Sequence, residues 1–269
     1  MKNMGVEVKK NKTAWRVMLV SITLSAIVFL VGCRKETAET KIPETEKENE
    51  ISQENTGLAY ETAKDASIDF KALQEENSDI FAWLYIPGTS IDYPVLQSEE
   101  ADDYYESHNA YAEADEEGAV YTELANLKNM CDFNTVLHGK TSSDGESGLF
   151  ADLYHFADPD FFAEHENAYL YLDGNLLTYE IFAAYERENT SLIRTYDFTY
   201  IAGCEQFLED MYGVREMGKN LREGWEEVTP YHFLITLTTE SPSDPNKQFV
   251  VIAALIGDAA GTIDRIVAE

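Results

Sequence analysis

The sequence predicts a mainly β protein, a closed or partly closed barrel with short flanking helices. About seven short segments alternate apolar and polar residues, are rich in β-branched and aromatic residues, and are separated by turn residues, as strands are. Hydrophobic residues make up 44% of the 269-residue chain, which is enough to fill one core of ordinary domain size. Many short strands with few helices favour a barrel, because closure removes unpaired sheet edges.

The elements are expected in the following order. An amphipathic helix comes first, indicated by the apolar spacing of Phe70, Leu73, Ile80 and Phe81. The strand-like segments "FAWLYI" and "SIDYPVLQ" follow, with the turn "PGT" between them. Further strands are expected at 118–121, 135–138, 168–172, 177–185, 233–239 and 249–255. Helical segments are expected near 148–156, 159–166 and 200–212.

Residues 1–33 have the features of a targeting segment. A basic start leads into an apolar run from Val17 to Gly32, 16 residues long, and then to Cys33. This run is shorter than the roughly 20 residues of a spanning helix. The tetrapeptide "LVGC" resembles the bacterial lipoprotein signal box, which implies cleavage before Cys33 and lipid acylation of this cysteine. The alternative is an uncleaved signal anchor followed by a chance cysteine. Both place the remaining chain on the extracytoplasmic side of the membrane.

The remaining chain divides into a tether and a domain, both acidic. Residues 34–58 are polar, charged and almost free of large apolar residues, so they are expected to be a disordered acidic tether ahead of a domain over residues 59–269. Setting aside residues 1–32, which hold five Lys or Arg and one Glu, leaves 15 basic and 49 acidic side chains. This negative charge argues against nucleic acid as a partner, because nucleic-acid affinity depends on neutralising phosphates with Lys and Arg.

Cysteines and acidic loops give no sign of a disulfide scaffold, a metal or a cofactor. Cys131 and Cys204 are too few for a disulfide scaffold, and we expect two buried thiols. The loops "SSDGESG" and "EADEEG" contain oxygen ligands and glycine but lack EF-hand spacing, so we interpret them as solvated loops. No cofactor is expected.

Several long segments, in order and spacing, resemble the class B sortases from Asn77 to Leu255. The resemblance implies an eight-stranded sortase barrel and a Gram-positive cell-surface transpeptidase that joins secreted proteins to cell-wall peptide. The segments are "NSDIFAWLYIPGTSIDYPVLQ", "DDYYESHN", "NTVLHGKTSSDGESGLFADLYHFADPDFF", "YLYLDGNLLTYEIFAAY" and "LITLTTES…KQFVVIA".

The resemblance also implies where the family's three catalytic positions fall, and all three are substituted. The family's His, in "Y-G-H-N", falls on Lys140 of "HGKT". Its nucleophilic Cys, which ends the strand "T-L-S-T-C", falls on Glu240 of "TLTTE". Its Arg, in "R-F-V-V", falls on Gln248 of "QFVV".

Each substitution removes a distinct chemical capacity. A carboxylate at position 240 is a poor substitute for a thiolate nucleophile. A lysine with its ordinary pKa of about 10.4 holds the proton that an imidazole would give to a leaving amine. An uncharged amide at position 248 stabilises an oxyanion less than a guanidinium, and losing such a donor costs roughly 100-fold in rate. Because the new pair is a carboxylate and an ammonium, we predict a salt bridge between Lys140 and Glu240.

Three functions stay open. The first is a surface-anchored, catalytically degenerate sortase that binds a sorting-signal peptide, a cell-wall peptide or an active sortase. The second is an active transpeptidase with a relocated nucleophile, Thr239, Ser241 or Cys131. The third is a structural envelope lipoprotein whose acidic face docks a cationic partner. For all three, the candidate groove residues are His138, Lys140, Thr141, Thr239, Glu240, Ser241 and Gln248.

Overall fold

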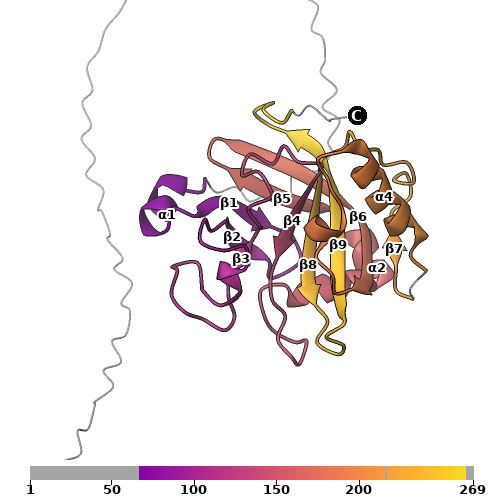
Figure 1. Cartoon of the computed structure of the whole chain (residues 1–269), viewed down its shortest axis with the longest axis horizontal. Helices are drawn as coiled ribbons and strands as arrows, with labels where there is room; N and C mark the ends of the chain where they lie inside the picture. Colours follow the sequence, from indigo (N-terminus) through magenta and orange to yellow (C-terminus); the bar gives the residue numbers. More distant parts are fainter. Residues whose placement is uncertain (1–66, 216, 265–269) are drawn as a thin grey trace, which may run out of the picture. The chain divides into compact units, whose positions relative to one another are not determined.

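Eight strands form a closed ring in the computed structural model, which describes residues 67–215 and 217–264 (Figure 1). The strands pair in the order β5-β1-β2-β3-β4-β8-β9-β6, and β6 pairs back with β5. A further strand, β7, pairs with β6 beyond the end of β5. The predicted mainly β, eight-stranded barrel is therefore confirmed. The strands are β1 Ile80–Tyr85, β2 Asp92–Leu96, β3 Val120–Tyr121, β4 Asn134–His138, β5 Asn167–Leu172, β6 Asn175–Glu188, β7 Asn220–Leu221, β8 Leu234–Glu240 and β9 Lys247–Asp258.

Short helices flank the barrel, and the first is shorter than predicted. It begins after Asp69, whose side chain accepts a hydrogen bond from the Ala72 N–H, and it ends before the extended residue Asn77. Ile80 and Phe81, expected to continue this helix, instead begin β1. The helices are α1 Phe70–Glu76, η2 Tyr104–Glu106, η3 Ala151–Ala157, α2 Pro159–Glu164, α3 Leu192–Thr195 and α4 Ile201–Gly213.

The predicted signal segment with Cys33 and the tether over residues 34–58 lie outside the described residues. Within 67–215 and 217–264, every helix is too short or too polar to cross a bilayer.

Alternation along the strands creates two apolar layers, one inside the ring and one outside it. In β8, Ile235 and Leu237 face the interior cluster, whereas Leu234 belongs to an outer cluster with Phe207 and Cys204 of α4. This follows from the two-residue period of a strand. α4 and its neighbours thus cover part of the outer face of β8 and β9, and the end of β8 near Glu240 remains exposed.

Candidate functional site

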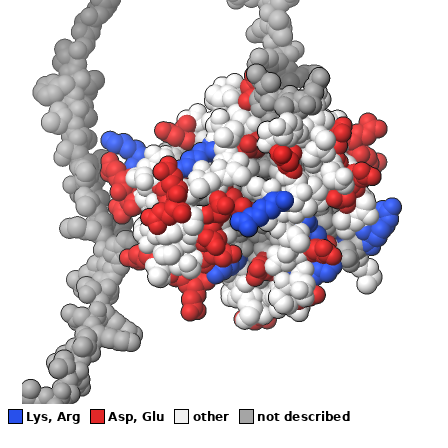
Figure 2. Space-filling model, in the orientation of Figure 1, with Lys and Arg blue, Asp and Glu red and all other residues white. Residues whose placement is uncertain are grey.

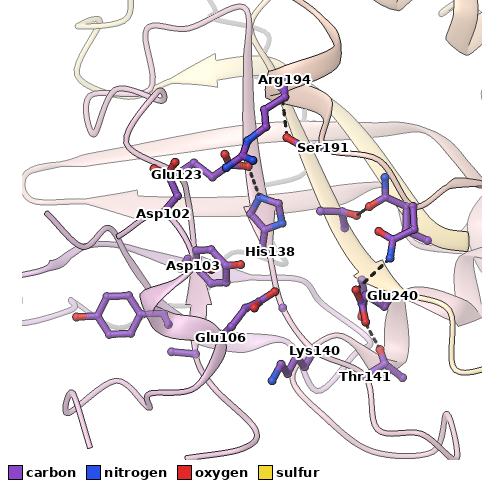
Figure 3. Close-up of a pocket in the computed structure, with 18 residues that line it drawn as sticks. Asp102, Asp103, Glu106, Glu123, His138, Lys140, Thr141, Ser191, Arg194 and Glu240 are labelled. Atoms are coloured by element: carbon purple, nitrogen blue, oxygen red, sulfur yellow. Dashed lines mark hydrogen bonds and ion pairs between the residues drawn. The ribbon is translucent and has the colours of Figure 1, made fainter. Parts of the chain in front are cut away.

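A groove of about 720 Å³ lies on the outer face of the barrel, where β4 and β8 end and β9 begins (Figure 3). Its walls come from these strands, from β3, from η2 and the residues before it, and from the chain around α3. Six of the seven predicted groove residues line it, and Ser241 does not. The polar and charged lining residues other than tyrosines are Asp102, Asp103, Glu106, Glu123, His138, Lys140, Thr141, Asn189, Ser191, Arg194, Thr238, Thr239, Glu240 and Gln248.

Strand pairing explains why residues far apart in sequence meet here. His138 pairs with Thr238 across β4 and β8, and Glu240 pairs with Gln248 across β8 and β9. Residues directly opposite each other in a sheet project to the same face. The structure therefore places Lys140, Glu240 and Gln248, the positions to which the sequence resemblance assigns the family's catalytic residues, along one groove.

The predicted salt bridge between Lys140 and Glu240 is wrong. The Lys140 Nζ donates to the main-chain oxygen of Glu116 at 3.0 Å, and Glu240 Oε1 accepts from Asn189 Nδ2 at 3.0 Å. Lys140 lies beyond the end of β4, so strand alternation no longer sets its direction. Its side chain points away from Glu240 in Figure 3.

Gln248 is a buried bridge between segments, with 7% of its surface exposed. Its Oε1 accepts from Thr238 Oγ1 at 2.7 Å, and its Nε2 donates to the main-chain oxygens of Glu188 at 3.2 Å and Thr190 at 3.0 Å. The amide therefore gives the buried Thr238 hydroxyl an acceptor and adds a second donor to two main-chain oxygens that also accept from the Thr190 N–H and from Arg187 Nη1. The side chain at this position now holds β8, β9 and the end of β6 together.

The hydroxyl groups near Glu240 are engaged with one another. Thr239 is 2% exposed, and its Oγ1 lies 2.8 Å from Thr141 Oγ1. Ser241 is 6% exposed, and its Oγ lies 3.2 Å from Ser243 Oγ. Neither is hydrogen-bonded to a lysine or histidine, the arrangement that activates a hydroxyl nucleophile.

A histidine, a carboxylate and a tyrosine pack together on the β3 side of the groove. The His138 Nε2 lies 3.3 Å from Glu123 Oε1, an ion pair when the imidazole is protonated, although the angle is poor for a hydrogen bond. The Tyr121 ring stacks on His138 with centroids 4.9 Å apart. His138 is thus a partly buried groove residue held on two sides.

Negative charge dominates this side of the molecule. Five carboxylates line the groove, against Lys140, Arg194 and one titratable histidine. Figure 2 shows Asp and Glu side chains gathered over the β2 and β3 side of this face. Burial, followed by the charges of Glu106 and Glu123, raises the pKa of Tyr121 well above its ordinary value. Asp103 and Glu240 add to this effect.

Neither cysteine lines the groove. Cys131 is partly exposed, which corrects the expectation of two buried thiols, and its Sγ contacts the main-chain oxygen of Asn129 at 3.6 Å. Cys204 is buried in α4, and its Sγ is 3.5 Å from the oxygen of Phe198. Across the described ranges, no three His, Cys, Asp or Glu side chains are placed to hold a metal ion.

Sequence reasoning missed the side of the groove formed by η2, β3 and α3. Glu123, Tyr121 and Arg194 line it, yet they come from segments far from the family's catalytic strands. The segment "DDYYESHN" resembles the family and holds three of the acids that line the groove, so it could have been named as a candidate part of the site. Its position in space was not predictable from the residues alone.

No protein-family model matches the chain. Among curated proteins, Sortase B of Listeria monocytogenes is 38% identical over 135 residues, which span 49% of this chain and only 50% of that protein. Sortase B of Staphylococcus aureus is 26% identical over 247 residues, which span 88% of this chain and 96% of that protein.

Solved structures show the same likeness. Clostridium perfringens sortase B superposes with a TM-score of 0.62 and 27% identity, over 70% of this chain and all of that chain. A Staphylococcus aureus sortase B-substrate complex superposes with a TM-score of 0.59 and 26% identity, over 70% of this chain and 84% of that chain.

Proposed function

From the likeness to class B sortases in sequence and fold, we propose that the chain is a catalytically degenerate, surface-anchored member of that family that uses the groove to bind a sorting-signal or cell-wall peptide. One observation carries the proposal. Lys140, Glu240 and Gln248 stand together at the family's catalytic positions, and the groove around them persists at about 720 Å³. A peptide site has therefore been retained where the groups for acyl transfer are missing.

The geometry also disfavours a relocated nucleophile. Acyl transfer needs a thiolate or an activated hydroxyl within reach of a base and of oxyanion donors. Cys131 and Ser241 do not line the groove, and the Thr239 hydroxyl is paired with Thr141. Gln248, at the position of the Arg, uses its amide nitrogen on two main-chain oxygens.

A peptide is the proposed ligand class because one of the similar structures, Staphylococcus aureus sortase B, is described as a substrate complex. The groove of this chain offers hydrogen-bonding groups on several sides, and a peptide main chain presents matching donors and acceptors.

The test compares the natural full-length protein, in non-ionic detergent, with the triple reversion Lys140→His, Glu240→Cys, Gln248→Arg. Both are incubated with a panel of sorting-signal peptides and hydroxylamine, and cleaved and transferred products are quantified by mass spectrometry. We expect turnover from the reversion alone. The reversion carrying Glu240→Ser instead of Glu240→Cys is the matched control, because it restores the imidazole and guanidinium without the thiol.

Turnover by the natural protein would contradict the proposal. Thr239→Ala, Ser241→Ala and Cys131→Ala would then identify the nucleophile. If neither protein turns over, direct binding of the same peptides decides whether the groove has kept a ligand.

The anchor is part of the same proposal and rests on "LVGC". Acylation at Cys33 would hold the domain at the extracytoplasmic face of a Gram-positive-type cell membrane. Labelling cells with a fatty-acid analogue should tag the natural protein and leave Cys33→Ala untagged. Label on Cys33→Ala would contradict the anchor without affecting the groove.

A further inference from the structure

The groove has a strong excess of negative charge that peptide binding in general does not require. Asp102, Asp103, Glu106, Glu123 and Glu240 all line it. Burying or crowding like charges is unfavourable unless something compensates them. The compensation visible in the described residues is small, because His138 is the one basic group within ion-pair distance of any of these carboxylates.

Neither cation of the groove forms an ion pair with these acids in the described part of the chain. The Lys140 ammonium is held by the Glu116 main-chain oxygen at 3.0 Å, and Lys140 points away from Glu240 (Figure 3). Arg194 belongs to the short helix α3, and the chain as described gives it no ion pair with a carboxylate. The groove carboxylates can therefore interact with a cationic group of a ligand.

A second observation points to a ligand at this place. Tyr121 is 7% exposed and lines the groove, yet its hydroxyl has no hydrogen-bond partner among residues 67–215 and 217–264. The hydroxyl oxygen is accessible from the groove, where it can bond to a group that enters it. The contrast with Tyr105 is direct, because the Tyr105 hydroxyl donates to Asp79 Oδ2 at 2.7 Å and accepts from Asn77 Nδ2 at 2.9 Å.

The surroundings of Tyr121 define the kind of ligand. The negative charges of Glu106, Glu123, Asp103 and Glu240 act together on its phenol, and the raised pKa keeps the phenol neutral. A neutral phenol oxygen accepts a hydrogen bond from an ammonium or guanidinium, whose charge the nearby carboxylates favour. The same carboxylates would repel an anionic ligand.

A metal ion does not fit this arrangement as well as an organic cation does. Calcium requires six to eight oxygen ligands at about 2.3–2.6 Å. Over the described part of the chain, no group of three acidic or other ligating side chains converges closely enough for a metal. The carboxylates are spread around the groove and do not converge on one point. This spacing suits a cationic group of several atoms, such as the end of a lysine or arginine side chain.

We infer that the groove selects a peptide carrying a lysine or arginine side chain, and that the cationic end of this side chain binds at the Tyr121 hydroxyl between Glu106 and Glu123. The inference rests on the proposed function, since it specifies the peptide that the groove takes. It predicts selectivity by charge at one position of the peptide.

The first experiment uses the natural full-length protein in non-ionic detergent and fluorescein-labelled Gly/Ser nonapeptides with blocked ends. One position at a time carries Lys, Arg, norleucine or Glu, and binding is followed by fluorescence anisotropy. Lys or Arg at one position should bind roughly tenfold more tightly than norleucine, and Glu most weakly. Raising the salt concentration should reduce the preference. An arm with a free N-terminus and no Lys or Arg tests whether a main-chain ammonium is taken instead.

The second experiment locates the cation with matched variants. Glu123→Gln and Tyr121→Phe keep the shape of each side chain, and Glu205→Gln, on an exposed position of α4, is the control. We expect the Lys-to-norleucine preference to fall roughly tenfold in Glu123→Gln and several-fold in Tyr121→Phe, with no change in the control. Thermal unfolding of each variant checks that the fold is intact.

The outcomes separate the inference from the function on which it rests. Equal binding of the Lys and norleucine peptides overturns the inference and leaves peptide binding standing. A preference that survives both groove variants, or tight binding only by the free N-terminus, also overturns it. If no peptide of any charge binds, including the sorting-signal panel, both the inference and the proposed function fall.

Discussion

The interior of the barrel and the groove on its outer face differ in what their residues must do. Interior residues such as Leu237 and Val251 are completely buried and need only fill space in staggered rotamers. The groove needs particular atoms at particular places, and three of its residues, Lys140, Glu240 and Gln248, occupy the positions that the sequence resemblance assigns to the family's catalytic residues. Under the proposed function, the barrel has kept its fold through changes that remove an acyl acceptor, a proton donor and a cationic hydrogen-bond donor.

The fold and the chemistry of this protein are specified by different residues. Packing tolerates replacement by any apolar group of similar volume. Catalysis fails when one nucleophilic atom is exchanged for another type.

The largest effect is expected in the interior. Leu237→Ala removes a fully buried side chain from the barrel core, and the cavity should lower the free energy of unfolding by about 2–5 kcal/mol. Leu127→Ala is the matched control, because Leu127 is 52% exposed and should change stability by less than about 0.5 kcal/mol. Urea unfolding followed by tryptophan fluorescence measures both. Equal losses would mean that the barrel interior is not the main source of stability.

Gln248 tests whether a former catalytic position now supports the fold. Gln248→Ala leaves the buried Thr238 hydroxyl without its acceptor and removes one of the donors to the Glu188 and Thr190 oxygens, so we expect a loss of about 1–3 kcal/mol in the free energy of unfolding. Gln206→Ala, on the exposed side of α4, should cost less than about 0.5 kcal/mol. A negligible change in the free energy of unfolding for Gln248→Ala would mean that Gln248 lines the groove without contributing to stability.

Gln248 also shows what the sequence could predict and what it could not. The sequence resemblance placed Gln248 and Glu240 among the groove residues, and both line the groove in the structure. The partners Glu188 and Thr190 belong to β6 and the loop after it, and no local pattern indicates which distant carbonyl groups a buried amide will meet.

Local patterns failed in two other places for related reasons. The spacing that suggested a helix through Ile80 and Phe81 mixed the apolar face of α1 with the start of β1, since a short apolar series fits both periods. Alternation also ended at His138, so it gave no information about the direction of Lys140.

Alkaline pH should distinguish a tyrosine in the core from one in the groove. Burial is the largest cause of the raised pKa of Tyr179 and of Tyr121. Four carboxylates add to it at Tyr121, whereas Cys131 and Asp258 add to it at Tyr179. A folded pKa above the unfolded value means that the contribution to stability is complete below about pH 10 and is lost as pH rises from there toward the folded pKa.

Tyr179→Phe and Tyr121→Phe should each flatten this alkaline loss of stability. One tyrosine accounts for at most about 1.4 kcal/mol per pH unit. Added salt should shrink the effect of Tyr121→Phe more than that of Tyr179→Phe, because salt screens charges and does not undo burial. Unfolding in urea between about pH 9 and pH 11, at low and high salt, provides the measurement. The same salt dependence for both variants would show that the groove carboxylates do not act on Tyr121.

The smallest effect concerns the two residues whose charges suggested a salt bridge. A double-mutant cycle of Lys140→Ala and Glu240→Ala should give a coupling energy near zero, within about 0.3–0.5 kcal/mol, because the two side chains have separate partners, the oxygen of Glu116 and the amide of Asn189. Asn189→Ala with Glu240→Ala is the comparison cycle and should couple measurably, since these side chains are joined at 3.0 Å. A large coupling between Lys140 and Glu240 would mean that they pair in solution. The groove would then have replaced its thiol and imidazole by one neutralised pair, and the acidic field inferred at Tyr121 would lose one of its carboxylates.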